Sequence, residues 1–158
     1  MSFTILYAED EENDIVFLEL AFKRAGSPHT LQAVPDGEEA IEYLGGEGAF
    51  ADRTRHPLPA LVLLDINMPK QTGLEVLEWI RQQSRFKSLP VLILTSSTRP
   101  GDMEDARRLG ADDYLLKPSD PLQLVELVKS LHDRWLTEPR APSNARRAKV
   151  EEIANTIK

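Results

Sequence analysis

Apolar residues recur along the first 136 residues in two patterns, one typical of strands and one typical of helices. Short apolar runs that are typical of strands cover residues 3–8, 29–34, 60–65, 90–95 and 112–117. After each of them, apolar residues recur every three or four positions, as on one face of a helix. These segments are 13–26, 36–46, 72–83, 101–110 and 120–136. The pattern predicts five strands and five helices in strict alternation.

The kind of sheet follows from the runs "ALVLLD" and "PVLILT". Both are continuously apolar, which is typical of parallel strands covered by helices on both faces. Right-handed crossovers then favour an α/β fold, a doubly wound open sheet with strand order 2-1-3-4-5.

Several residues mark the expected helix ends. Gly26 is suited to end the first helix, and Asp36 to cap the second. Asp120 precedes Pro121 and stands three residues before Gln123, which predicts a capping box at the start of the last helix.

Two stretches lie outside this alternation. Residues 45–59 form a long loop that contains Gly and Pro. Residues 137–158 begin as a Pro-rich linker, carry an excess of basic residues, and have the apolar positions Val150, Ile153 and Ile157 of a possible short helix. We therefore expect one domain over residues 1–136 and a tail over 137–158.

Polar side chains follow four of the predicted strands. In open α/β sheets ligands bind beyond the carboxyl ends of the strands, so these side chains should share one pocket. They are Glu9 and Asp10 after the first strand, Asp65 and Asn67 after the third, Thr95 at the end of the fourth, and Lys117 after the fifth.

The chemistry of this set points to phosphoryl transfer. Clustered carboxylates repel one another, and an oxygen-preferring divalent cation such as Mg²⁺ removes the repulsion. Lys117 adds a positive charge for an incoming phosphoryl oxygen, and Thr95 adds a hydroxyl donor. A carboxylate beside a metal and a lysine can form an aspartyl phosphate, so Asp65 is the candidate phosphoacceptor.

Each residue also has a simpler interpretation. Glu9 and Asp10 could cap the first helix, together with the acidic residues at 11, 12 and 14. A strand-end Asp is often an N-cap, and a lysine before a proline is usually a solvated surface residue. The joint placement favours the shared site.

The motifs "ILYAED", "LLDINMP" with Gly73, "LILTSS" and "DDYLLKP" resemble those of receiver domains of two-component response regulators, over roughly residues 3–135. The resemblance implies a flavodoxin-like fold and phosphorylation of Asp65 by a histidine kinase. It implies Mg²⁺ binding by the carboxylates of Asp10 and Asp65 and the backbone carbonyl of Asn67, with Glu9 acting mainly through water. Many relatives carry Asp at the position of Glu9.

The same resemblance assigns the remaining groups. Lys117 would contact the phosphoryl group, ahead of a cis peptide bond to Pro118, and Thr95 and Tyr114 would form the switch pair. Ser96 stands where Ala is frequent. The long loop, the segment "SRFKSLPVLILTSS" and the ending "HDRWL" are most similar to stand-alone receivers that serve phytochrome-type histidine kinases.

Composition limits the remaining classes. The chain has 158 residues, no cysteine and a net charge of −7, which disfavours disulfides, thiolate metal sites and nucleic-acid binding. No apolar run approaches a membrane span, and the N-terminus lacks the features of a signal peptide, so we expect a cytoplasmic protein.

Rival functions lack a required residue. A phosphatase of the haloacid dehalogenase type needs a second Asp where this chain has Asn67. A nucleotide-binding flavodoxin-like protein needs a Gly-rich phosphate loop, and none follows a strand. A transcription factor is disfavoured because no second domain fits after Trp135. We expect a switchable binding module that is not an enzyme in the usual sense and acts through protein contact or onward phosphotransfer.

The last helix also suggests self-association. Leu124, Val128, Leu131 and Trp135 lie at helical spacing. Part of this stripe must cover the sheet, but Trp135 is expected beyond the end of the sheet. We therefore predict a homodimer in which the last helix and the tail take part.

Overall fold

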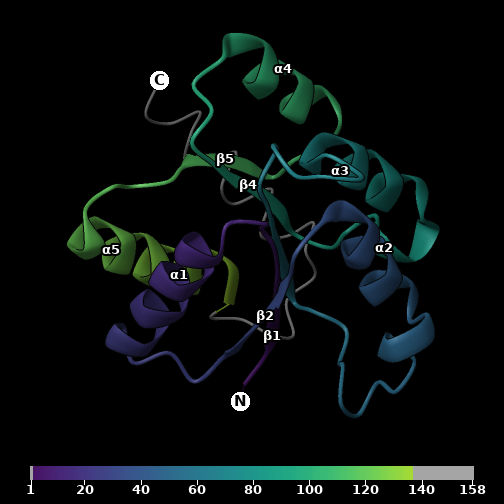
Figure 1. Cartoon of the computed structure of the whole chain (residues 1–158), viewed down its shortest axis with the longest axis horizontal. Coiled ribbons are helices and arrows are strands. Elements are labelled where there is room, and N and C mark those ends of the chain that lie inside the picture. The colour runs from purple at the N-terminus through teal and green to yellow at the C-terminus, as the bar shows by residue number, and fades with distance from the viewer. Residues whose placement is uncertain (1, 137–158) are drawn as a thin grey trace.

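The computed structural model describes residues 2–136, in which five parallel strands form one sheet (Figure 1). The strand order is β2-β1-β3-β4-β5, as the sequence predicts. The strands are β1 (Thr4–Ala8), β2 (Thr30–Val34), β3 (Leu61–Leu64), β4 (Val91–Thr95) and β5 (Asp113–Leu116).

The five predicted helices are all present, with ends shifted by one to five residues. They are α1 (Glu12–Arg24), α2 (Gly37–Gly45), α3 (Gly73–Gln82), α4 (Pro100–Arg108) and α5 (Pro121–Leu131). Short 3₁₀ turns at Gly48–Phe50 and Ser84–Phe86 interrupt the loops before β3 and β4.

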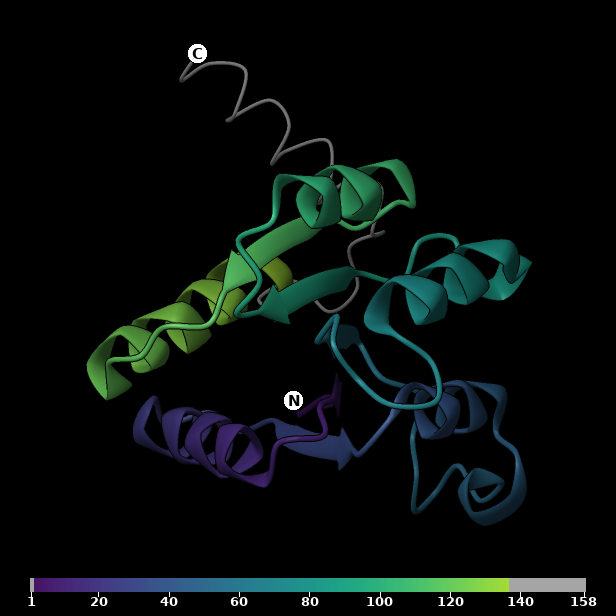
Figure 2. The same ribbon diagram turned by 45° about the horizontal axis from the view of Figure 1, so that its top comes forward.

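Helices cover both faces of the sheet. Neighbouring residues of a strand point to opposite sides, and the central strands are apolar at every position, so both faces must be covered. In β3, Leu61 and Leu63 pack with α1 and α5, while Val62 and Leu64 pack with α2 and α3. Figures 1 and 2 show α1 and α5 side by side on one face and α2 and α3 on the other. The continuous apolar runs are therefore explained by burial on both faces.

Local side-chain bonds fix the helix starts. Asp36 accepts a hydrogen bond from the backbone of Glu39 at 2.8 Å, as its position suggests. Asp120 accepts from the backbone of Leu122 at 2.9 Å rather than from Gln123, so the predicted capping box is replaced by a single cap. A complete capping box occurs instead at Thr72 and Glu75, at the start of α3.

The long loop before β3 is tied to α2 by one arginine. The guanidinium of Arg53 donates to the carbonyl oxygens of Tyr43 and Leu44, each at 2.8 Å, and to that of His56 at 3.2 Å. The first two are carbonyls in the last turn of α2, where the regular helical hydrogen bonds run out, although Tyr43 also accepts from the N–H of Gly46 at 3.1 Å. Arg53 thus acts as a C-terminal cap that orders the loop.

The end of the last helix differs from the prediction. The α-helix stops at Leu131 and continues as a π-helical turn over His132–Leu136. Trp135 is only 2% exposed and belongs to the core beneath α1 and α5. It is therefore buried within its own chain, and the expectation that it lies beyond the sheet is wrong. The predicted tail, including Val150, Ile153 and Ile157, lies outside the described residues.

Within residues 2–136, no helix is long and apolar enough to cross a membrane.

Candidate functional site

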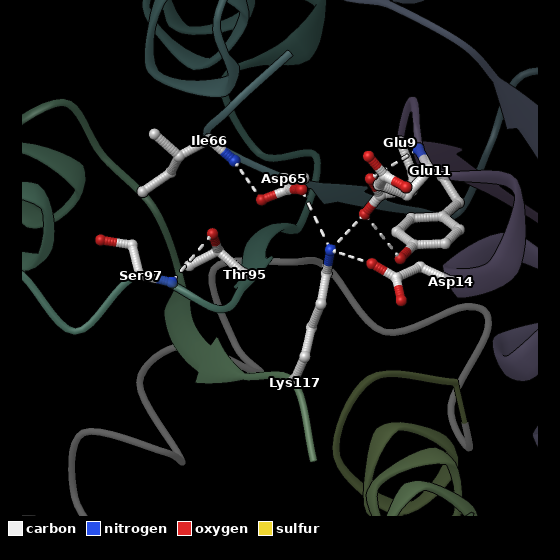
Figure 3. A network of polar contacts seen from close by, with 9 residues as sticks. Glu9, Glu11, Asp14, Asp65, Ile66, Thr95, Ser97 and Lys117 are labelled. Atoms are coloured by element: carbon white, nitrogen blue, oxygen red, sulfur yellow. Dashed lines mark hydrogen bonds and ion pairs between the residues drawn. The ribbon is translucent and has the colours of Figure 1, made fainter. Parts of the chain in front are cut away.

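Acidic and basic side chains meet at the carboxyl end of the sheet, as the strand order requires. Carboxylate oxygens of Glu9, Asp10 and Asp65 all lie within 4.8 Å of one another. Lys117, from the loop after β5, reaches across to the same point (Figure 3). Groups separated by more than 100 residues in the sequence thus form one cluster.

Lys117 is the centre of the ion pairs. Its ammonium nitrogen lies 3.0 Å from Asp65 Oδ2 and 2.8 Å from Asp14 Oδ2, and it also contacts Glu9 Oε2. Glu9 Oε2 in turn accepts a hydrogen bond from the hydroxyl of Tyr7 at 3.1 Å. The sequence does not single out Asp14 or Tyr7 for this site, because neither follows a strand directly.

Burial shapes the ionisation of the cluster. It raises the pKa of Glu9 to about 7, although Lys117 and the backbone N–H of Glu11 act in the opposite direction. Burial alone would lower the pKa of Lys117, but its bonds to Asp14 and Glu9 and the charge of Asp65 outweigh this and raise it. Lys117 therefore stays charged. Its single ammonium group faces several carboxyl groups, so acidic groups outnumber basic ones in the cluster.

The backbone around Asp65 is held by a tight turn between β3 and α3. The amide N–H of Asp65 donates to the carbonyl of Ala8 at 3.1 Å, and its Oδ1 accepts from the N–H of Ile66 at 2.8 Å. Gly73, the first residue of α3, comes so close that a Cβ atom there would lie 2.0 Å from the carbonyl oxygen of Asp65. Gly73 therefore lets α3 begin directly against the strand end that carries Asp65.

A second turn is clamped in the same way by Gly37, whose Cβ would lie 2.2 Å from the carbonyl oxygen of Gln71. This places the start of α2 against the loop after Asp65. The sequence gives little indication of this contact, since Gly37 reads as an ordinary residue of the first helical turn.

On the β4 side, Thr95 is fully buried, and its hydroxyl oxygen accepts from the N–H of Ser97 at 3.3 Å. The hydroxyl of Tyr114 donates to the carbonyl of Ser97 at 3.0 Å, and Ser97 Oγ donates to Asp102 at 2.6 Å. Ser97 thus connects Thr95 with Tyr114 and with α4. The sequence does not identify Ser97 as a link of this kind.

Two further expectations from the sequence concern Asn67 and the peptide bond between Lys117 and Pro118. The side chain of Asn67 is exposed, and the proposed role of its backbone carbonyl stays a prediction. The peptide bond between Lys117 and Pro118 is trans, where the family resemblance implied cis. An X–Pro bond intrinsically prefers trans by about 0.5–1 kcal/mol.

The donor set suits a hard divalent cation. Glu9, Asp10 and Asp65 offer only oxygen ligands, and Asp10 is exposed to solvent, so water can complete the coordination. Mg²⁺ prefers such sites, where few carboxylates and several waters surround it. The structure is that of a small α/β domain with a cluster of acidic side chains at the carboxyl end of its sheet.

The family is shown by a direct match. The model of the response regulator receiver domain matches residues 5–129, so the chain belongs to that family. Response regulator Rcp1 of Synechocystis is 32% identical over 139 residues, which cover 88% of this chain and 92% of Rcp1.

Solved structures of response regulators are also similar to this chain in sequence and fold. RPA3017, a response regulator in red light signalling of R. palustris, is 38% identical with a TM-score of 0.80, covering 84% of this chain and 93% of that one. The phosphorylated cyanobacterial phytochrome response regulator RcpA is 34% identical with a TM-score of 0.78, covering 86% and 95%. A structure of Rcp1 contains Mn²⁺ and has a TM-score of 0.75 at 32% identity, covering 85% and 94%.

Proposed function

We propose that this receiver domain accepts a phosphoryl group from a histidine kinase on Asp65 and thereby changes its affinity for protein partners. The observation that carries the proposal is the position of the Asp65 carboxylate, 3.0 Å from Lys117 and beside two further carboxylates. A phosphorylated relative, RcpA, supports it.

The transfer is a substitution at phosphorus. An oxygen of Asp65 forms the new P–O bond, and the P–N bond of the kinase phosphohistidine breaks, with its electron pair returning to the imidazole nitrogen. Lys117 neutralises charge on the phosphoryl oxygens, because its ammonium already lies against the accepting carboxylate. Later hydrolysis by water releases inorganic phosphate and restores the carboxylate.

Glu9, Asp10 and Asp65 are the carboxylates that would hold Mg²⁺, with the backbone carbonyl of Asn67 as a further ligand. The related response regulator Rcp1 has a Mn²⁺-bound form, which supports binding of a divalent cation by this chain. When bound, the cation supplies charge neutralisation for the phosphoryl oxygens. Within the chain, Tyr7 and Glu11 keep Glu9 oriented toward the cluster.

Asp10→Ala should weaken Mg²⁺ binding and slow phosphorylation by acetyl phosphate. Loss of even an outer-shell partner typically lowers metal affinity about 10- to 100-fold, so loss of a direct ligand should cost at least tenfold. Without metal, the variant should melt at the same or a higher temperature, because one repelling charge is gone. Titration of tryptophan fluorescence with Mg²⁺ measures the affinity; an unchanged value would remove Asp10 from the ligand set.

The switch is proposed to run from Thr95 to Tyr114. A phosphoryl group adds nearly two negative charges and three strong acceptors, which should draw the Thr95 hydroxyl toward Asp65. That movement breaks its bond with Ser97, whose carbonyl also holds Tyr114. Tyr114 is then free to move inward, and the segment from residue 96 to 116 adjusts.

Thr95→Ala should accept phosphate yet lose most of this response. Amide hydrogen exchange over residues 96–116, with and without beryllofluoride and Mg²⁺, measures the effect. The wild type should show a clear change in exchange and the variant little. Equal changes in both proteins would refute the proposed switch while leaving Asp65 as the acceptor.

A histidine kinase of the phytochrome type is the proposed donor, since RcpA is a phytochrome response regulator and RPA3017 belongs to red light signalling. This phosphoryl transfer would take place in the cytoplasm, where the kinase has access to ATP.

An apolar patch on α1 offers a contact surface for the kinase: Val16, Phe17 and Leu20 are 49%, 55% and 42% exposed. Asp14, one turn away, contacts Lys117, so a partner on this patch would lie close to Asp65.

A homodimer is proposed as well, through β5 and α5. In the described part of the chain β5 pairs with β4 alone, and Leu116 at its end is 49% exposed. A hollow of about 330 Å³ beside it is lined mainly by residues of β5, α5 and the π-helical turn after α5, including Leu115, Leu127 and Trp135. Unpaired edge strands are common sites of association.

The dimer should be the main species at tens of micromolar. Light scattering gives the molecular mass in solution. It should be measured for the full chain, for a chain that ends at Leu136, and for the Leu116→Asp variant. Leu116→Asp should be monomeric, because it places a charge in the interface. A monomeric full chain at that concentration would contradict the proposal.

A further inference from the structure

All three protons of the Lys117 ammonium are engaged in the structure. An ammonium group has three donors and no more. Its nitrogen contacts Asp14 at 2.8 Å, Asp65 at 3.0 Å and Glu9 (Figure 3). A phosphoryl oxygen can therefore be bound by Lys117 only if one of these carboxylates gives up its hydrogen bond.

The three carboxylates differ in how firmly they are held. Glu9 is fully buried, and its oxygens also accept from Tyr7 and from the backbone of Glu11, each at 3.1 Å. Separating a buried charge from its partner is strongly unfavourable. Asp65 is itself the proposed acceptor. The side chain of Asp14 is 35% exposed on the first turn of α1, so water can replace Lys117 there at little cost.

We infer that Asp14 is a positioning residue that competes with the phosphoryl group for Lys117. The inference rests on the proposed function of Asp65. With its carboxylate at 2.8 Å, Asp14 draws the ammonium toward α1 and adds negative charge beside the site. Both effects lower the affinity for an anion at Asp65, and the added charge raises the affinity for a cation.

Asp14→Asn should therefore shift two affinities in opposite directions. At saturating Mg²⁺, beryllofluoride should bind about three- to fivefold more tightly than to the wild type, the range expected for loss of a half-exposed ion pair. The affinity for Mg²⁺ alone should fall. Isothermal titration calorimetry measures both. A purely structural role of Asp14 would weaken both or neither.

Two matched variants separate the Lys117 contact from general charge. Glu12→Gln removes one negative charge from the same exposed helical turn and should change the beryllofluoride affinity much less than Asp14→Asn. Asp14→Glu keeps the charge and should stay near the wild-type value. Equal effects of Asp14→Asn and Glu12→Gln, or no effect of either, would overturn the inference alone. A wild type that fails to bind beryllofluoride with Mg²⁺ would overturn the proposed function, and the inference with it.

Discussion

Asp65→Asn is expected to abolish acid-labile phosphorylation by acetyl phosphate and by a histidine kinase. Asp65 contacts Lys117 at 3.0 Å, and its carboxylate lies within 4.8 Å of carboxylate oxygens of Glu9 and Asp10. An amide cannot form the acyl phosphate, because its oxygen is a far weaker nucleophile than a carboxylate oxygen. Retention of labelled phosphate after gel filtration measures the loss.

The fold should survive this change. The amide oxygen of the variant can still accept from the N–H of Ile66, as Asp65 Oδ1 does at 2.8 Å, and the substitution removes one charge from a crowded acidic pocket. Thermal melting should therefore show equal or greater stability. Normal labelling of Asp65→Asn would exclude Asp65 as the acceptor.

Phe17→Ser is the complementary control, because Phe17 belongs to the apolar patch on α1 that is proposed to contact the kinase. This variant should accept phosphate from the kinase more slowly, and its labelling by acetyl phosphate should be unchanged.

Gly73→Ala is expected to be among the most damaging small substitutions in the chain. The added Cβ would lie 2.0 Å from the carbonyl oxygen and 2.8 Å from the carbonyl carbon of Asp65, both backbone atoms that cannot rotate away. Overpacking of this kind destabilises by about 3 kcal/mol. That corresponds to a melting temperature lower by roughly 10 °C. Since β3 and α3 must separate, Asp65 should also shift, and Mg²⁺ binding should weaken.

Gly101→Ala is the matched control. Gly101 lies in α4, and a Cβ there would meet no atom within 4 Å. Alanine is favoured over glycine in a helix by about 0.5–1 kcal/mol, so this variant should be as stable as the wild type or slightly more so. If Gly73→Ala melted like Gly101→Ala, the close approach of α3 to Asp65 would be wrong.

The fold was predictable because its pattern is unusually regular. The central strands are apolar on both faces, which only a helix-covered parallel sheet explains, and the predicted strand order is confirmed. That order places the ends of β1 and β3 side by side and the end of β5 one strand further away, beyond β4, within reach of the long side chain of Lys117. The meeting of Glu9, Asp10, Asp65 and Lys117 therefore followed from topology, whereas their catalytic and metal-binding roles stay predictions.

Contacts that depend on side-chain reach could not be predicted. Asp14 lies on α1, and its contact with Lys117 depends on how that helix is oriented. The cap that Arg53 forms on α2 depends on the path of an irregular loop. The position of Trp135 at the end of a long helix predicts that it lies beyond the sheet, whereas it is buried in the core from the π-helical turn His132–Leu136. In each case the sequence contains the residue but not the geometry.

In the proposed function Asp65 carries the phosphoryl group. The most direct measurement is to phosphorylate the wild type with a histidine kinase and ATP in Mg²⁺, reduce the acyl phosphate with borohydride, and locate the modified residue by mass spectrometry of its peptides. Asp65 should be reduced, and none of Glu9, Asp10 and Asp14 should be. Reduction at any of those three with Asp65 intact would contradict the proposed function.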